Sequence, residues 1–215
     1  TPLYSSAASD VYKRQIYHGR SVMNGAKRAL VIVDMPFGTV SGNPLKSLEY
    51  AIRMMKETGA DALKIEGGEE VIPDIKKIID AGIPVMGHLG LMPQSINKYG
   101  TYNVRAKDNA EADKLIKDAL LLQEVGCFGM VLEKIPAELT KTVSSQLTIP
   151  TIGIGAGPHA DGQVLVVHDM LGINKNFSPK FLRRYADLHT VMTEAVQGYI
   201  KDVKSEDFPN DNESY

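Results

Sequence analysis

The stretch RALVIV, residues 28–33, is a continuous apolar run that is followed at once by Asp34. A run of this kind, without polar alternation, is typical of a strand that is buried on both faces of a parallel sheet. Asn43–Pro44 then offers a helix cap and a proline suited to the first helical turn. Leu45–Met55 carries apolar residues at helical spacing, and Gly59 can end that helix. The sequence therefore predicts one βα unit here.

The same alternation continues along the rest of the chain. Strands are predicted to begin at residues 28, 61, 83, 128, 149 and 163, and helices to cover 69–80 and 109–125, to open at Pro136, and to start at Ser178–Pro179. The loop from Gly87 to about Asp108 is longer than most connections, which makes it a candidate active-site loop. Alternating βα units indicate a parallel sheet covered by helices. Six strands suit a doubly wound sheet, because a (β/α)8 barrel needs eight strands and about 250 residues.

Composition bounds the possible functions. The chain has 215 residues, of which 43% are hydrophobic and 23% charged, as expected for one α/β domain. A net charge of −2 gives no reason to expect a nucleic acid or a membrane surface as partner. No apolar run approaches the roughly 20 residues of a membrane-spanning helix. A single cysteine, Cys127, excludes an internal disulfide and fits a cytoplasmic location.

The two ends of the chain read differently from its centre. Residues 1–15 are small and polar without a helical or strand period, and they lack the apolar segment of a signal peptide. We expect them to form a flexible or foreign extension. Residues 16–202 would form the domain, and residues 203–215 a polar, loosely held tail.

Ionisable residues follow four successive predicted strands. Asp34 follows the first, Lys64 and Glu66 end the second, His88 lies just past the third, and Glu133 follows the fourth. In a parallel sheet the carboxyl ends of the strands lie along one edge, where α/β enzymes place their active sites. A single acidic residue at a strand end is more often a helix cap or a surface charge. Four consecutive strands that end in this way indicate a site.

The residue types suggest the chemistry of that site. Asp34 and Glu66 offer hard oxygen ligands, which suit Mg²⁺ better than zinc. Lys64 points to the same side of its strand as Glu66 and is a natural partner for a substrate carboxylate. It could also form a Schiff base, although neighbouring carboxylates would keep it protonated. Glu133 could act as a general base, or it could simply pair with Lys134 or another surface lysine.

Several long motifs resemble a known family. They are VDMPFG (33–38), ADALKIEGG (60–68), PVMGHLGLMPQS (84–95), VLEKIP (131–136) and IPTIGIGAGPHADGQVLVVHDMLG (149–172). In this order they resemble the ketopantoate hydroxymethyltransferase family, and the resemblance runs from about Ile16 to Tyr215.

The resemblance implies a (β/α)8 TIM-type barrel of the phosphoenolpyruvate/pyruvate superfamily. It implies transfer of a hydroxymethyl unit from 5,10-methylenetetrahydrofolate to 3-methyl-2-oxobutanoate, through an enolate stabilised by Mg²⁺. The product would be ketopantoate, on the route to pantothenate and coenzyme A. The expected partners are therefore a small 2-oxo acid and a folate, together with further copies of the chain, because family members form homo-oligomers.

The resemblance also implies a role for each candidate residue. Asp34 matches a metal-binding aspartate beside the substrate, and Glu66 a further acidic group around that metal. Lys64 matches a lysine that contacts the substrate, and His88 an active-site histidine in the substrate-binding group. Glu133 matches the proton acceptor.

The chain departs from the family pattern at its start. Family members begin with two further βα units, of which the first carries a GDS-type motif with a metal-binding aspartate, whereas IYHGRSVMNGA (16–26) looks like the helix before the third strand. We therefore expect six strands that correspond to strands three to eight, and a chain with little or no activity. Two alternatives are an incompetent fragment that keeps only fold and assembly surfaces, and a related Mg²⁺-dependent carbon–carbon lyase of 2-oxo acids.

Overall fold

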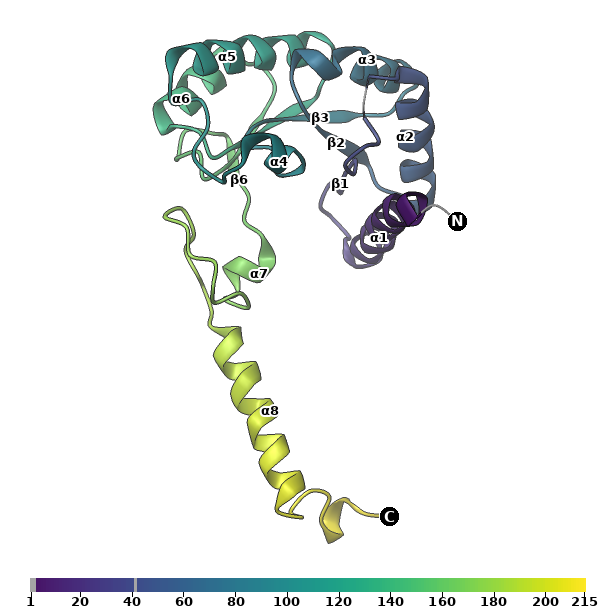
Figure 1. The fold of residues 1–215 in the computed structure, drawn as a ribbon, viewed down its shortest axis with the longest axis vertical. Coiled ribbons are helices and arrows are strands. Elements are labelled where there is room, and N and C mark those ends of the chain that lie inside the picture. The colour runs from purple at the N-terminus through teal and green to yellow at the C-terminus, as the bar shows by residue number, and fades with distance from the viewer. Residues whose placement is uncertain (1–2, 41) are drawn as a thin grey trace. The chain divides into compact units, whose positions relative to one another are not determined.

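Six short parallel strands form a single sheet in the computed structural model, which describes residues 3–40 and 42–215 (Figure 1). They are β1 Ile32–Asp34, β2 Ala62–Glu66, β3 Val85–Gly90, β4 Gly129–Glu133, β5 Thr151–Ile154 and β6 Gly162–Gln163. Each strand pairs with the next one along the chain, in the order β1-β2-β3-β4-β5-β6. The six predicted strands are present, although β1 and β6 are shorter than predicted.

Helices connect these strands and cover the outer face of the curled sheet (Figure 1). They are α1 Leu3–Gly25, α2 Pro44–Thr58, α3 Ile72–Asp80, α5 Asn109–Glu124 and α6 Ala137–Gln146, with the short segments η1 Glu69–Val71, η2 Pro93–Ser95 and α4 Ile96–Tyr99. A curled, all-parallel sheet with helices outside it is the arrangement of a TIM-type barrel. The doubly wound alternative, which has helices on both faces of the sheet, does not describe this unit.

Local sequence signals set the ends of the helices. The Asn43 side chain accepts a hydrogen bond from the Lys46 amide at 3.2 Å, and Pro44 occupies the first turn of α2. Gly59 ends α2 in the left-handed conformation, with φ +73°. The Asp108 side chain caps α5 by accepting from the Glu111 amide at 2.9 Å. These caps satisfy backbone groups that the helix itself leaves unpaired.

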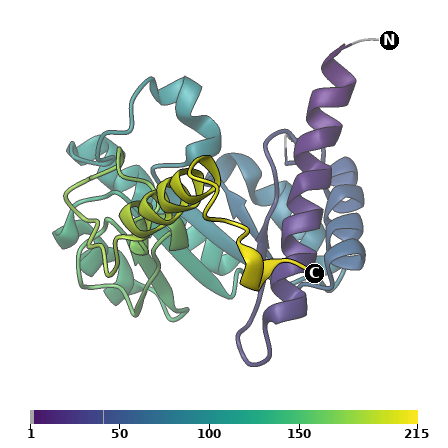
Figure 2. The same cartoon turned by 90° about the horizontal axis from the view of Figure 1, so that it is seen from below.

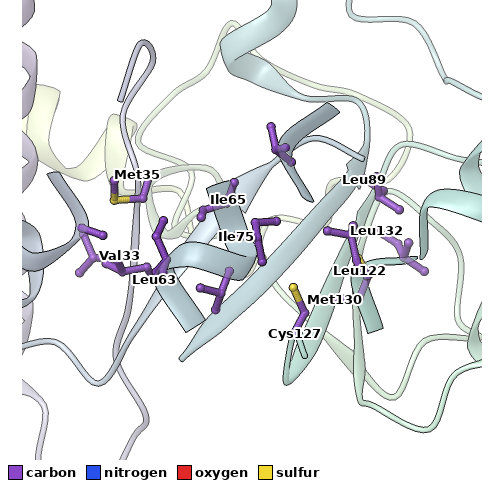
Figure 3. Packing of buried hydrophobic residues seen from close by; sticks show 14 of the residues in the cluster. Val33, Met35, Leu63, Ile65, Ile75, Leu89, Leu122, Cys127, Met130 and Leu132 are labelled. Carbon is purple, nitrogen blue, oxygen red and sulfur yellow. The ribbon is translucent and has the colours of Figure 1, made fainter. Parts of the chain in front are cut away.

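The hydrophobic core lies between the sheet and its helices (Figure 3). Leu63 and Ile65 of β2 and Met130 and Leu132 of β4 are almost completely buried in it. Cys127 is 2% exposed, and its burial raises the pKa of the thiol to about 12. The prediction of a buried, inert cysteine is therefore confirmed.

Residues 3–25 form one helix, α1, which lies beside α2 (Figure 2). Residues 1–15 were expected to form a flexible or foreign extension; residues 3–15 are helical in the structure, while Thr1 and Pro2 lie outside the described residues. Tyr12 is 4% exposed, and its hydroxyl donates to the Tyr50 carbonyl at 2.6 Å. Arg53 also lies over the Tyr12 ring, 4.9 Å from its centroid. Tyr12 thus holds the first part of α1 against α2, although the sequence of that part shows no helical period.

Residues 164–215 form a second unit that contains α7 Val167–Met170, α8 Leu188–Lys204 and η3 Asp211–Glu213. Two predictions need correction here. The expected strand over 163–167 pairs only as far as Gln163. The expected helix from Ser178 begins instead at Leu188, because the Asp187 side chain caps it by accepting from the Thr190 amide at 3.2 Å.

The preceding segment is held in a non-helical conformation by Arg184, whose guanidinium donates to the Phe177 carbonyl at 2.6 Å. The predicted tail 203–215 begins within the last turn of α8 and includes η3. Among the helices of the described residues, none is long and apolar enough to cross a membrane.

Candidate active site

Strand register brings the five candidate residues to one edge of the sheet. Asp34 of β1 lies opposite Lys64 of β2, and Glu66 of β2 lies opposite His88 of β3. Glu133, the last residue of β4, lies opposite Gly90 of β3. Because the strands are parallel, all of these positions lie at or near their carboxyl ends. The predicted grouping of the five side chains is therefore present in the structure.

Lys64 joins two members of the group. Its Nζ lies 3.1 Å from Asp34 Oδ1 and 3.2 Å from His88 Nδ1. An ammonium can only donate, so His88 Nδ1 accepts this hydrogen bond, and the ring proton belongs on Nε2. Lys64 thus determines the tautomer of the histidine.

His88 is the most deeply buried member of the group, with a side chain that is only 3% exposed. Burial lowers the pKa of the imidazole, and the neighbouring Glu133 opposes this effect. Its Nε2 lies 3.3 Å from Glu133 Oε2 but has no hydrogen-bond partner among the described residues. A neutral ring whose N–H faces the Glu133 carboxylate can orient that carboxylate without neutralising it.

Glu66 has an unusual acidity. Burial raises the pKa of its carboxyl from 4.5 to about 7, because the cost of burying the charge outweighs the lowering by the Lys64 ammonium and by the Gln94 amide. The negative charges of Asp34 and Glu133 raise the pKa further, by smaller amounts. The backbone amide of Gln94 donates to Glu66 Oε2 at 3.1 Å. Near neutral pH this carboxyl is therefore partly protonated, and a nearby cation would stabilise its ionised form.

The donor set suits Mg²⁺ with few protein ligands. No group of three or more His, Cys, Asp or Glu side chains arranged to hold a metal occurs within residues 3–40 and 42–215. Asp34 and Glu66 offer two carboxylates, and Mg²⁺ is commonly held by one or two carboxylates with water and substrate oxygens. The Asp34 side chain is 44% exposed, so a ligand can reach it. The raised pKa of Glu66 also fits a metal-binding role, because a bound cation would neutralise the charge of the buried carboxylate.

Two residues of the site do not stand out in the sequence by residue type. Gln94 lies in the long loop, where its side chain donates to the Met35 carbonyl at 2.8 Å while its amide binds Glu66. Gly90 has φ +97°, and a Cβ there would lie 2.1 Å from the Glu133 carbonyl oxygen. Both residues lie in the motif PVMGHLGLMPQS (84–95) and in the long segment from Gly87 to about Asp108, but neither signal singles them out.

A cavity of about 610 Å³ borders the site on the side of α5. Leu89 and Gly90 of β3 line it, together with Tyr99 and Arg105 of the segment between β3 and α5 and Asp118 of α5. Its lining contains both acidic and basic side chains, so charge alone does not select a ligand for it.

Comparison with known proteins gives consistent matches. The family model described as ketopantoate hydroxymethyltransferase matches residues 4–211. A 3-methyl-2-oxobutanoate hydroxymethyltransferase from Bacteroides fragilis is 68% identical over 202 residues, which cover 94% of this chain and 74% of the relative. The protein of the same name from Bacteroides thetaiotaomicron is 67% identical over the same shares.

Among solved structures, a protein from Burkholderia cenocepacia J2315 that is described as a lyase/mutase has a TM-score of 0.50 and 12% sequence identity. The match covers 92% of this chain and 68% of that protein. At this identity the likeness concerns the fold alone.

Proposed function

Because this chain belongs to the ketopantoate hydroxymethyltransferase family, we propose that its site transfers a hydroxymethyl group to 3-methyl-2-oxobutanoate and so forms ketopantoate. We further propose 5,10-methylenetetrahydrofolate as the donor of the one-carbon unit. The observation that carries the proposal is the series of contacts from Asp34 through Lys64 and His88 to Glu133, at the carboxyl edge of the sheet. It combines groups that can bind an anion, hold a cation and accept a proton.

Substrate binding would use the more exposed part of the group. The Lys64 ammonium, 3.1 Å from Asp34, can bind the carboxylate of the keto acid. Asp34 and Glu66 would hold Mg²⁺, which supplies a Lewis acid that polarises the carbonyl of a chelated 2-oxo acid. With only these two carboxylates, we expect this chain to bind Mg²⁺ weakly and to turn over slowly.

Proton abstraction would belong to Glu133. Its carboxylate accepts the single hydrogen on C3 of the keto acid, and the electron pair of the broken C–H bond forms the enolate. Water adds to the methylene carbon of the donor as its two C–N bonds break, which releases tetrahydrofolate and leaves a one-carbon unit at the oxidation level of formaldehyde. C3 of the enolate attacks the carbon of this unit to form the new C–C bond, and the oxygen of the unit takes a proton to become the hydroxyl group of ketopantoate. His88, neutral and 3.3 Å from Glu133, would orient the carboxylate for the first step.

The remaining features of the proposal concern the whole protein. We propose that the six strands belong to a (β/α)8 barrel, in line with the curled parallel sheet and with the 74% of the relatives' length that this chain matches. We also propose self-association in the cytoplasm. The exposed apolar side chains of α8 support the assembly, and the biosynthetic role of the relatives suits that compartment.

Deuterium exchange at C3 tests the assignment of Glu133 without the folate. The chain is incubated with Mg²⁺ and 3-methyl-2-oxobutanoate in D₂O, and incorporation is followed by NMR. We expect it to exceed the protein-free rate, and Glu133→Gln to lower the protein-dependent part by about 100-fold or more. Glu138→Gln, at an exposed acid on α6, is the matched control. Equal rates for Glu133→Gln and the unmodified chain would falsify the assignment.

The same mixture distinguishes the alternatives when the donor is added. Formation of ketopantoate that depends on 5,10-methylenetetrahydrofolate supports the transferase. Cleavage of a 2-oxo acid without the folate would favour a carbon–carbon lyase. Absence of any exchange above the protein-free rate at saturating Mg²⁺ would identify a chain that keeps only its fold and assembly surfaces.

A further inference from the structure

Lys134, the residue directly after Glu133, has an uncommon backbone conformation. Its φ is +48°, in the left-handed region that side chains other than glycine rarely adopt. Such a conformation persists only where the surrounding structure holds it, and it is found preferentially at functional sites. The strained conformation directly after the proposed proton acceptor therefore suggests a functional role for Lys134.

Three polar groups of Lys134 bind two different segments. Its amide donates to the Ile154 carbonyl of β5 at 2.9 Å, and its carbonyl accepts from the Arg105 amide at 2.8 Å. Its ammonium donates to the Tyr102 carbonyl. Arg105 and Tyr102 both lie in the loop formed by residues 91–108, here called the β3–α5 loop. One residue thus joins this loop to the carboxyl end of β5.

The β3–α5 loop is also fastened at its other end. The Leu91 amide donates to the Glu133 carbonyl at 2.8 Å, so both ends of the loop bind the Glu133–Lys134 dipeptide. Between these ends, the Gln94 amide binds Glu66. Arg105 lies over the Tyr99 ring, 4.3 Å from its centroid, which stiffens the loop further.

We propose that Lys134 is a positioning residue for proton abstraction. Its ammonium fixes the β3–α5 loop, and the fixed loop holds the backbone at residues 133 and 134 so that the Glu133 carboxylate stays against His88. This rests on the proposed function, in which Glu133 accepts the proton. A glycine at position 134 would adopt the same φ without strain and would keep the backbone hydrogen bonds to the loop. It would lose the contact of the ammonium with the Tyr102 carbonyl, which the side chain contributes.

Two substitutions separate the parts of this role. Lys134→Met keeps most of the aliphatic stem and removes the ammonium, and Lys134→Arg keeps a cationic donor. Lys141→Met, at an exposed lysine on α6, is the matched control. In hydrogen exchange followed by mass spectrometry, we expect Lys134→Met to speed amide exchange in residues 91–108 by about tenfold, as for the loss of one charged hydrogen bond. Lys134→Arg and Lys141→Met should stay within about threefold of the unmodified chain.

Deuterium incorporation into 3-methyl-2-oxobutanoate then tests the catalytic consequence. Lys134→Met should lower the maximal rate by about tenfold and leave the KM for the keto acid within about twofold, because Lys64 and Asp34 remain in place. The ring NMR signals of His88, 3.3 Å from Glu133, should also move in Lys134→Met and not in Lys141→Met.

The outcomes test the role of Lys134 and the proposed function of the site independently. An unchanged exchange rate in the β3–α5 loop would overturn the fixing role of Lys134. A faster loop with an unchanged maximal rate and unchanged His88 signals would overturn the positioning role. If the unmodified chain itself incorporates no deuterium, the proposed function fails, and loop exchange together with the His88 signals still decides whether Lys134 holds Glu133 in place.

Discussion

The protonation of Glu66 depends strongly on its surroundings. Its carboxyl is buried beside Asp34 and Glu133, and the pKa rises from 4.5 to about 7. The folded protein therefore binds this proton more tightly than the unfolded chain does. Between pH 4.5 and about 7 the folded state retains a proton that the unfolded state has released, so the free energy of unfolding falls as pH rises through this window.

Replacing Glu66 tests this directly. Glu66→Gln cannot ionise, so its free energy of unfolding should not fall through this window. The difference in unfolding free energy between Glu66→Gln and the unmodified chain should therefore grow from pH 4.5 and level off above about pH 7. The total growth should be at most about 3 kcal/mol. Urea denaturation at several pH values measures the difference. Glu49→Gln, at an exposed acid on α2, should show no such growth. A constant difference between Glu66→Gln and the unmodified chain would contradict a raised pKa.

Much of the site could be predicted from residue type and position in the sequence. Asp34, Glu66 and Glu133 are the last residues of their strands, as expected to within one residue, whereas His88 lies within β3 and not past its end. The family match confirms the resemblance read from the motifs around these residues. Their separate roles stay predictions. The tautomer of His88 could not be predicted, because it depends on Lys64 Nζ lying 3.2 Å from Nδ1, a contact between two strands.

At the scale of elements, β3 leaves no room for a side chain beside β4 at Gly90. The φ of +97° and the approach of the Glu133 carbonyl both require a residue without a Cβ. Gly82 also has a positive φ, +88°, but nothing within 4 Å of its Cβ position. A comparison of Gly82 with Gly90 therefore separates the cost of backbone strain from the cost of steric overlap.

We expect Gly82→Ala to cost about 1 kcal/mol, through strain alone. Gly90→Ala should cost about 3 kcal/mol or more and should also slow deuterium incorporation, because the added methyl group displaces Glu133. Chemical denaturation and C3 exchange measure the two effects. Similar losses for the two variants would show that the contact with Glu133 has no consequence.

Two segments differ from what the local sequence patterns predicted. The apolar spacing of residues 181–195 predicted a helix from Ser178, but Arg184 binds carbonyl groups of the preceding turn and Asp187 provides the working cap. Residues 3–15 show the converse. They lack an apolar period, yet they continue α1, where Tyr12 packs against α2 residues. In each case contacts between side chain and backbone, or between elements, outweighed the local pattern.

At the scale of the whole molecule, α8 presents an unburied apolar face. Its exposed members, which recur at helical spacing, are Val191, Met192, Val196, Tyr199, Ile200 and Val203. No residue of this helix is buried within the described part of the chain. A patch of this kind on a protein is commonly covered in an assembly.

We therefore expect the chain to sediment at micromolar concentration as a species larger than the 23.5 kDa monomer. Val196→Glu should weaken the association by about tenfold or more, because a charge would be buried in the contact. Gln197→Glu, on the polar side of the same helix, should leave it unchanged. Sedimentation velocity measures both, and a monomeric unmodified chain would refute the expectation.

The strand order β1-β2-β3-β4-β5-β6 has a consequence for how the protein is made. Each strand after β1 pairs with the strand synthesised just before it, so each new pairing closes only the segment of chain between two consecutive strands. Folding can then advance from the amino to the carboxyl end while the ribosome is still translating, and each added βα unit extends the structure already formed. Glu133 would complete the proton-transfer group before β5 and β6 have left the ribosome.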